Sequence, residues 1–172
     1  MSVPLPKLLR LSLLVALAGV LHYVEGMLPL PLPVPGFKLG LANVITLYVV
    51  ATYGLKDAVL VAFSRVALGS LLAGVLFSPT FFMAMAGALA ACAVMYGACR
   101  LLGRWFSLAG ISVMGAVTHN LAQLLVAALL IGNLDLFYYL PYLVLLAVPT
   151  GTGTGLAVMY LRPHIPDTFT FS

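Results

Sequence analysis

A few ionisable and amide side chains lie within long apolar stretches, and their spacing points to a binding site. Arg65 follows Lys56 by nine residues in one such stretch, about 13 Å further along a helix. A charge at that depth in a membrane is costly, even for a long arginine side chain. Arg65 is therefore either a structural arginine capped by carbonyl groups or a contact to an anionic or carbonyl ligand.

A second polar group lies in a later apolar stretch, at about the same depth as Arg65. His119 and Gln123 are four residues apart and share a helix face, and Asn120 lies three residues before Gln123. Inside lipid, these side chains must turn inward, where they either bond neighbouring helices or form the wall of a polar cavity. One histidine with amides is a poor metal-ligand set, so we predict no metal and no cofactor.

A third group is expected near the outer side of the membrane. His22 and Glu25 end the first apolar stretch, Asn43 and Thr46 begin the second, and Lys38 lies between them. With Arg65 and the later polar group, these residues are predicted to bind a small molecule in a chamber with Lys38 at its rim. For Glu25 the alternative is an acid at the level of the lipid headgroups.

The segment 29–38 carries proline at every second position from Pro29 to Pro35. Such a run blocks helix formation and favours a stiff, extended chain. The segment is either a plain loop or a lid over an outward-facing cavity.

The elements that must position these residues follow from composition. Hydrophobic residues make up 63% of the chain and charged residues 7%, whereas soluble domains carry about 25% charged residues. The sequence predicts an all-α integral membrane protein in which residues 1–172 form one six-helix bundle. The second span is short and is expected to be tilted or to begin below the surface. The predicted spans are 8–28, 39–54, 58–77, 80–102, 111–132 and 137–161.

Basic residues between the spans indicate orientation. If the N-terminus is cytoplasmic, six of these basic residues lie on the cytoplasmic side and only Lys38 lies on the outer side. Both termini are therefore predicted to be cytoplasmic. Scattered cations of this kind indicate membrane orientation and not nucleic-acid binding. The six inner residues are Lys7, Arg10, Lys56, Arg100, Arg104 and Arg162.

Small residues mark expected close contacts. Ser12, Ala16 and Gly19 form a stripe on the first span, which serves either internal packing or contact with a partner protein. The glycine-rich run 151–155 lacks the lysine of a phosphate loop and predicts a flexible or closely packed helix. Cys92 and Cys99 are expected to be small buried hydrophobic residues.

Three runs together resemble one bacterial family, that of heptaprenyl diphosphate synthase component I, also called the Gx transporter family. These runs are 35–43 (PGFKLGLAN), 65–74 (RVALGSLLAG) and 111–123 (ISVMGAVTHNLAQ), and the resemblance extends over about residues 10–160.

The resemblance implies a fold similar to the substrate-binding S-components of energy-coupling factor transporters, in a bacterial cytoplasmic membrane. In such proteins the ligand lies near the outer face, under the loop between the first two spans. Small residues of the first span contact a transmembrane coupling subunit that cytoplasmic ATPases drive. Ser12, Ala16 and Gly19 are suitably placed for that contact.

The acidic residues of this chain can be compared with those that a prenyl diphosphate synthase needs for catalysis. Prenyl transfer needs clustered carboxylates that hold magnesium against a diphosphate. The chain has four acids, none of them paired: Glu25, Asp57, Asp135 and Asp167. The chain by itself is therefore predicted not to be an enzyme, although it remains a candidate membrane partner of a soluble catalytic subunit.

Three functions follow from these observations. The first is a transport subunit that binds an isoprenoid or quinone precursor, or a vitamin-like or flavin-like compound. The second is a non-catalytic membrane component of polyprenyl diphosphate synthase. The third is a structural subunit of a membrane redox complex, in which the polar side chains only bond helices together.

Overall fold

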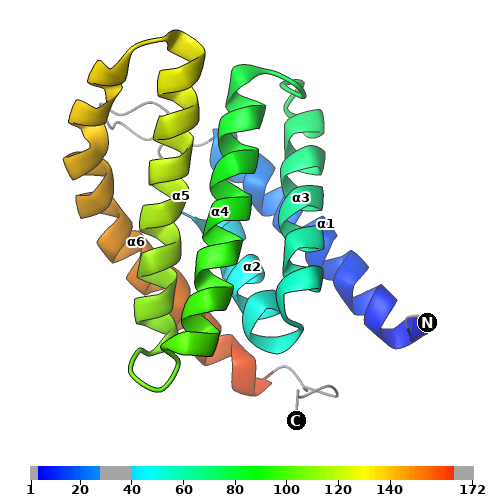
Figure 1. Cartoon of the computed structure of the whole chain (residues 1–172). Coiled ribbons are helices and arrows are strands. Elements are labelled where there is room, and N and C mark those ends of the chain that lie inside the picture. The colour runs from blue at the N-terminus through cyan, green and yellow to red at the C-terminus, as the bar shows by residue number, and fades with distance from the viewer. Residues whose placement is uncertain (1–3, 28–39, 165–172) are drawn as a thin grey trace.

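The computed structural model describes residues 4–27 and 40–164 of the chain, and these residues are helical with no strand among them. Six α-helices lie among these described residues, the connections from α2 to α5 are short, and a 3₁₀ turn, η1, precedes α6 while η2 follows it (Figure 1). The elements are α1 (Leu5–Met27), α2 (Leu41–Thr52), α3 (Leu55–Leu72), α4 (Pro79–Leu101), α5 (Leu108–Ile131), η1 (Leu134–Tyr139), α6 (Leu140–Leu161) and η2 (Arg162–His164).

Local sequence explains where the long central helices begin and end. Ser78 precedes α4 and Ser107 precedes α5, and each serine oxygen accepts a 3.4 Å hydrogen bond from an amide of the first turn. Pro79 follows Ser78 as the first residue of α4, where a missing amide hydrogen has no cost. Gly132 ends α5 with a left-handed backbone, φ 71°.

Helices α3, α4 and α5 run roughly parallel to one another, while α1 crosses behind them at a slant and α6 is inclined to α5 (Figure 1). The central helix α5 packs against both α4 and α6, and α1 packs against α3. The short α2 occupies the lower half of the bundle in Figure 1, where it contacts α1, α3, α4 and α6. Its first turn therefore lies inside the bundle and not at an outer edge.

The first helix and the third begin at the same end of the bundle. A salt bridge of 2.6 Å joins Nζ of Lys7 to Oδ2 of Asp57 there. The last helix, α6, also ends on this side (Figure 1). The location of the basic residues near these ends on the cytoplasmic side remains a prediction.

Two glycines of α6 bring it against α5. A Cβ atom on Gly151 would lie 2.7 Å from Cα of Val113, and one on Gly155 would lie 2.4 Å from Cα of Ala109. Such distances leave no room for a methyl group, so the glycine-rich run is a closely packed helix segment.

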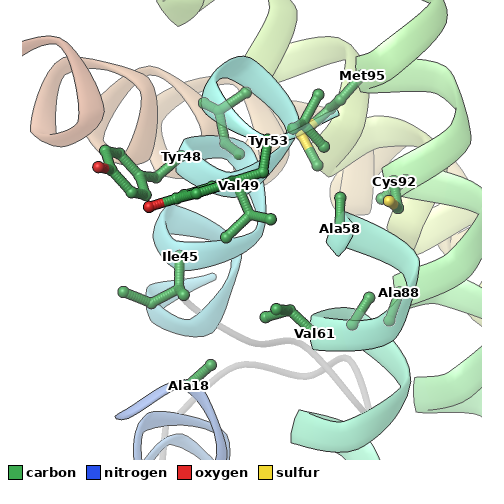
Figure 2. Close-up of a cluster of buried hydrophobic side chains, with 14 of the residues drawn as sticks. Ala18, Ile45, Tyr48, Val49, Tyr53, Ala58, Val61, Ala88, Cys92 and Met95 are labelled. Carbon is green, nitrogen blue, oxygen red and sulfur yellow. The ribbon is translucent and has the colours of Figure 1, made fainter. Parts of the chain in front are cut away.

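The apolar core gathers around α2 (Figure 2). Val49 of α2 and Val61 of α3 are completely buried, as is Cys92 of α4. The core residue Cys92 thus is the small buried hydrophobe that the sequence predicted, whereas Cys99 is half-buried, and both thiols are free.

The outer surface is apolar, as expected in lipid. Large side chains point away from the bundle and are mostly exposed, such as Leu13 and Leu129 at 71% and 70%. Four helical segments are long and apolar enough to cross a membrane: α1, α4, α5 and the continuous segment Leu134–His164. These are the features of a multi-pass membrane protein.

The remaining two helices differ from the predicted spans. The 12 residues of α2 cover about 18 Å, less than the hydrocarbon thickness. The third helix begins at Leu55 and ends at Leu72 instead of spanning 58–77, because the chain turns at Gly74 with φ 69°. Its 18 residues include Lys56, Asp57 and Arg65, too many charges for an ordinary spanning segment. Six crossings remain a prediction.

Candidate functional site

The site is built around Arg65, whose side chain is only 2% exposed in the middle of the bundle. Its Nη2 donates a 2.7 Å hydrogen bond to Oδ1 of Asn43, and its Nη1 lies 3.5 Å from Nδ1 of His22. The Nε of Arg65 has no hydrogen-bond partner among the described residues. A buried donor without a partner is costly, so this N–H is available to a ligand oxygen.

Glu25 lies beside this arginine and is also buried, at 4% exposure. Its carboxylate accepts hydrogen bonds from the backbone amides of Gly40 and of Leu41, the latter at 3.1 Å. It therefore caps the N-terminus of α2, where the helix dipole stabilises a negative charge. Gly40 allows this approach with a left-handed backbone, φ 82°. The carboxylate is thus buried within the bundle, and its depth in the membrane remains a prediction.

Glycines of neighbouring helices make room for the two site histidines. The His22 ring lies on Gly69, where a Cβ atom would come within 2.5 Å of the imidazole Cδ2. The His119 ring lies on Gly87, where a Cβ atom would come within 3.0 Å of Cε1 and Nδ1. The polar site therefore depends on two positions without a side chain.

The polar face of α5 turns inward, as the sequence predicted. His119, Asn120 and Gln123 are all buried, between 6% and 7% exposed. Asn120 donates a 3.2 Å hydrogen bond from Nδ2 to the backbone oxygen of Leu143, which joins α5 to α6. His119 and Asn120 line the same cavity as Arg65. The two interpretations of this face, cavity wall and interhelical bonding, both describe Asn120.

The structure adds hydroxyl groups that the sequence reasoning missed. Oγ of Ser112 and Oγ1 of Thr154 lie 2.6 Å apart, and Thr150 lines the same cavity. One signal was available: Ser112 precedes His119 by seven residues, which is two helix turns and the same face. The threonines gave no such signal, because their face depends on how α6 packs.

These side chains enclose a polar cavity of about 20 Å³, enough for about one water molecule. A larger, mostly apolar cavity of about 200 Å³ lies next to it between α4, α5 and the start of α6. Asn120 lines both cavities, whereas Gln123 lines only the apolar one. Polar groups beside apolar room suit a ligand with a polar head and an apolar body.

The other predicted residues lie apart from this centre or outside the described residues. Lys38 and the proline-rich segment 29–38 fall outside the residues that the structure describes. Thr46 is buried and bonds the backbone oxygen of Ala42 within α2.

The predicted small-residue stripe of α1 divides between two faces. Ser12 and Ala16 are exposed, whereas Gly19 is buried and faces Leu68 of α3. A Cβ atom added to Gly19 would lie 3.3 Å from Cβ of Leu68. Internal packing therefore explains Gly19, and the two exposed positions remain available to a partner.

The described residues hold no group of three or more His, Cys, Asp or Glu side chains that would bind a metal ion. The three acids in this part of the chain lie in different places. Glu25 caps α2, Asp57 pairs with Lys7 at the start of α3, and Asp135 is exposed in η1.

The fold and this site define a helical membrane protein with a buried, arginine-centred polar cavity. The chain belongs to the family of heptaprenyl diphosphate synthase component I, which matches it over residues 14–161. No curated protein and no solved structure matches the chain.

Proposed function

We propose that this chain is the non-catalytic membrane component of a polyprenyl diphosphate synthase in the bacterial cytoplasmic membrane. The observation that carries the proposal is the separation of its acids in a member of this family. Magnesium-dependent prenyl transfer needs neighbouring carboxylates, and Glu25, Asp57 and Asp135 lie apart. The catalytic carboxylates then come from a soluble partner subunit.

In this role the membrane component binds the growing prenyl chain, which becomes too hydrophobic to remain in water. The apolar cavity beside Asn120 and the lipid-facing surface accept isoprenoid units, while Arg65 offers its free Nε–H to an anionic or carbonyl head. Because the polar cavity holds only about 20 Å³, a head enters when the lining side chains move apart.

The test is a reconstituted synthase in liposomes, with the soluble subunit alone and with this chain added. We expect added chain to lengthen the prenyl products and to co-purify with the soluble subunit. Arg65→Met should abolish the lengthening, whereas the exposed Arg104→Gln should retain it. Unchanged product length with correctly folded chain would refute the synthase role.

A second candidate is an S-component-like transport subunit, and the position of α2 favours it. Transporter sites often lie near the membrane midplane, at the N-terminus of a short or interrupted helix. The N-terminus of α2 lies inside the bundle, at the cavity that holds Arg65 (Figure 1). In this role an energy-coupling transmembrane subunit contacts Ser12 and Ala16, and cytoplasmic ATPases drive it.

This candidate predicts a ligand that stays bound during purification. Mass spectrometry of the detergent-solubilised protein should find an isoprenoid, quinone-like or flavin-like compound. Adding a soluble quinone or riboflavin should then raise the thermal unfolding temperature of the wild type but not of Arg65→Met. An empty protein with no such shift would count against transport.

A further inference from the structure

A further cavity, of about 420 Å³, lies at the end of the bundle where α2, α4 and α6 finish and α5 begins. Arg100 of α4 and Arg162 at the end of α6 both line it, so two helices bring guanidinium groups to one space. None of the described residues that line this cavity is acidic. We call it the Arg100–Arg162 cavity.

One of the two guanidinium groups is held in place by an aromatic ring. Arg100 lies over the ring of Tyr96, one turn earlier in α4, with 5.5 Å from its Cζ to the ring centroid. A cation–π contact of this kind orients the guanidinium without using its hydrogen-bond donors. Tyr96 lines the cavity as well, so this contact keeps the guanidinium group of Arg100 beside the cavity.

The start of α5 adds to the positive potential of the cavity. Ser107 and Leu108 line it, and Leu108 is the first residue of a helix of 24 residues that Ser107 caps. Oγ of Ser107 already accepts from the Gly110 amide, and the dipole of the helix favours a nearby anion. Two arginines together with this helix start make the cavity suited to an anion that carries more than one charge.

The remaining walls are apolar. Val50 of α2, Ile111 of α5 and Phe106 of the connection before α5 line the same cavity. At this end of a membrane protein, a ligand with a charged head and a hydrocarbon tail places the head at the arginines and the tail along the apolar side chains. Basic pockets between transmembrane helices bind lipid headgroups in this way.

We propose that the Arg100–Arg162 cavity binds the phosphate or diphosphate head of an amphiphile. Two sources share this chemistry: an anionic phospholipid of the membrane and a prenyl diphosphate. The inference does not depend on the synthase role, since the site is separate from the Arg65 cavity and its test is binding. If the source is a prenyl diphosphate, the cavity gives the synthase product a place at the membrane surface.

The experiment measures thermal unfolding of the full chain in nanodiscs and detergent. Nanodiscs of phosphatidylglycerol are compared with nanodiscs of phosphatidylcholine, and farnesyl diphosphate is titrated in detergent beside inorganic diphosphate. We expect an amphiphile with a net anionic phosphate or diphosphate head to raise the unfolding temperature and the double variant Arg100→Gln, Arg162→Gln to bind it about tenfold more weakly. The larger shift, with phosphatidylglycerol or with farnesyl diphosphate, identifies the source.

Arg104→Gln is the matched control, because Arg104 is exposed in the connection between α4 and α5 but does not line the cavity. Arg104→Gln should bind like the wild type. The double variant Arg100→Lys, Arg162→Lys should keep most of the binding, and it replaces the double glutamine variant as the test if that variant does not fold. Equal loss in Arg104→Gln would show diffuse surface charge and overturn the proposal. A response to inorganic diphosphate as strong as that to farnesyl diphosphate would overturn its amphiphile part.

Failure here is distinguishable from failure of the synthase role. Binding that depends on Arg100 and Arg162 without any effect on product length would refute the synthase role alone. Longer products with no such binding would refute the cavity proposal alone.

Discussion

Nη2 of Arg65 donates a 2.7 Å hydrogen bond to Oδ1 of Asn43, and this bond joins α3 to the first turn of α2 inside the bundle. The same arginine reaches His22 of α1 through Nη1. Three helices therefore meet at one guanidinium group, and its Nε–H remains without a partner among the described residues. This centre is the basis of the first prediction.

Arg65→Met keeps most of the volume but removes every donor. We expect the variant to fold with a loss of about 1–3 kcal/mol in unfolding free energy, because Asn43 loses its buried donor. Ligand-induced thermal shifts and synthase stimulation should disappear. If Arg65→Leu combined with His119→Leu retains full function, these groups only bond helices and the binding site is refuted.

Glu25→Gln tests the cap on α2. The amide oxygen still accepts from Leu41, but the negative charge beside the helix N-terminus is lost. Hydrogen bonds to charged groups contribute more than hydrogen bonds to neutral groups, so we expect the free energy of unfolding to fall by about 1–2 kcal/mol. Thermal unfolding measures this loss. Asp135→Asn, at an exposed acid, should change the unfolding temperature little. Equal effects of both variants would contradict the capping role.

Two glycines of α4 form a matched pair for the His119 site. Gly87→Ala would place a methyl group 3.0 Å from His119 Cε1, whereas Gly97→Ala would meet nothing within 4 Å. We expect Gly87→Ala to destabilise the fold by about 1–3 kcal/mol and to weaken ligand binding. Gly97→Ala should be neutral or stabilising, because alanine favours helix. Thermal unfolding and ligand titration of both variants decide this.

A second matched pair lies on α6 and tests its contact with α5. Gly155→Ala would push a methyl group to 2.4 Å from the backbone of Ala109, while Gly153→Ala would meet open space. Backbone yields less than a flexible side chain, so Gly155→Ala should lower the yield of monodisperse protein and the unfolding temperature. A wild-type unfolding temperature for Gly155→Ala would show that α5 and α6 do not pack this closely.

Orientation is tested by cysteine labelling in intact cells. In a Cys92→Ala, Cys99→Ala background, Arg104→Cys places a single thiol at an exposed position before α5, and Asp135→Cys places one at an exposed position after it. With cytoplasmic termini, an impermeant maleimide should label position 135 but label position 104 only after lysis. Labelling of both positions in intact cells would remove the proposed topology.

The sequence by itself was enough to predict the class of protein and most helices. Hydropathy is a sum over neighbouring residues, so an apolar run such as that of α4 was located to within a residue or so: the prediction was 80–102 and the helix is Pro79–Leu101. The inward turn of His119, Asn120 and Gln123 was also predictable, because helical spacing fixes which residues share a face.

Tertiary structure alone decided which hydrogen bonds the polar residues form with one another. Glu25 and Gly40 are far apart along the chain, and no local pattern shows that a carboxylate caps α2 within the bundle. Likewise, Gly19 and Ala16 look equivalent in sequence, yet one faces Leu68 and the other is exposed. Periodicity specifies a face of a helix, but the neighbour of that face depends on how six helices pack, which is a non-local property.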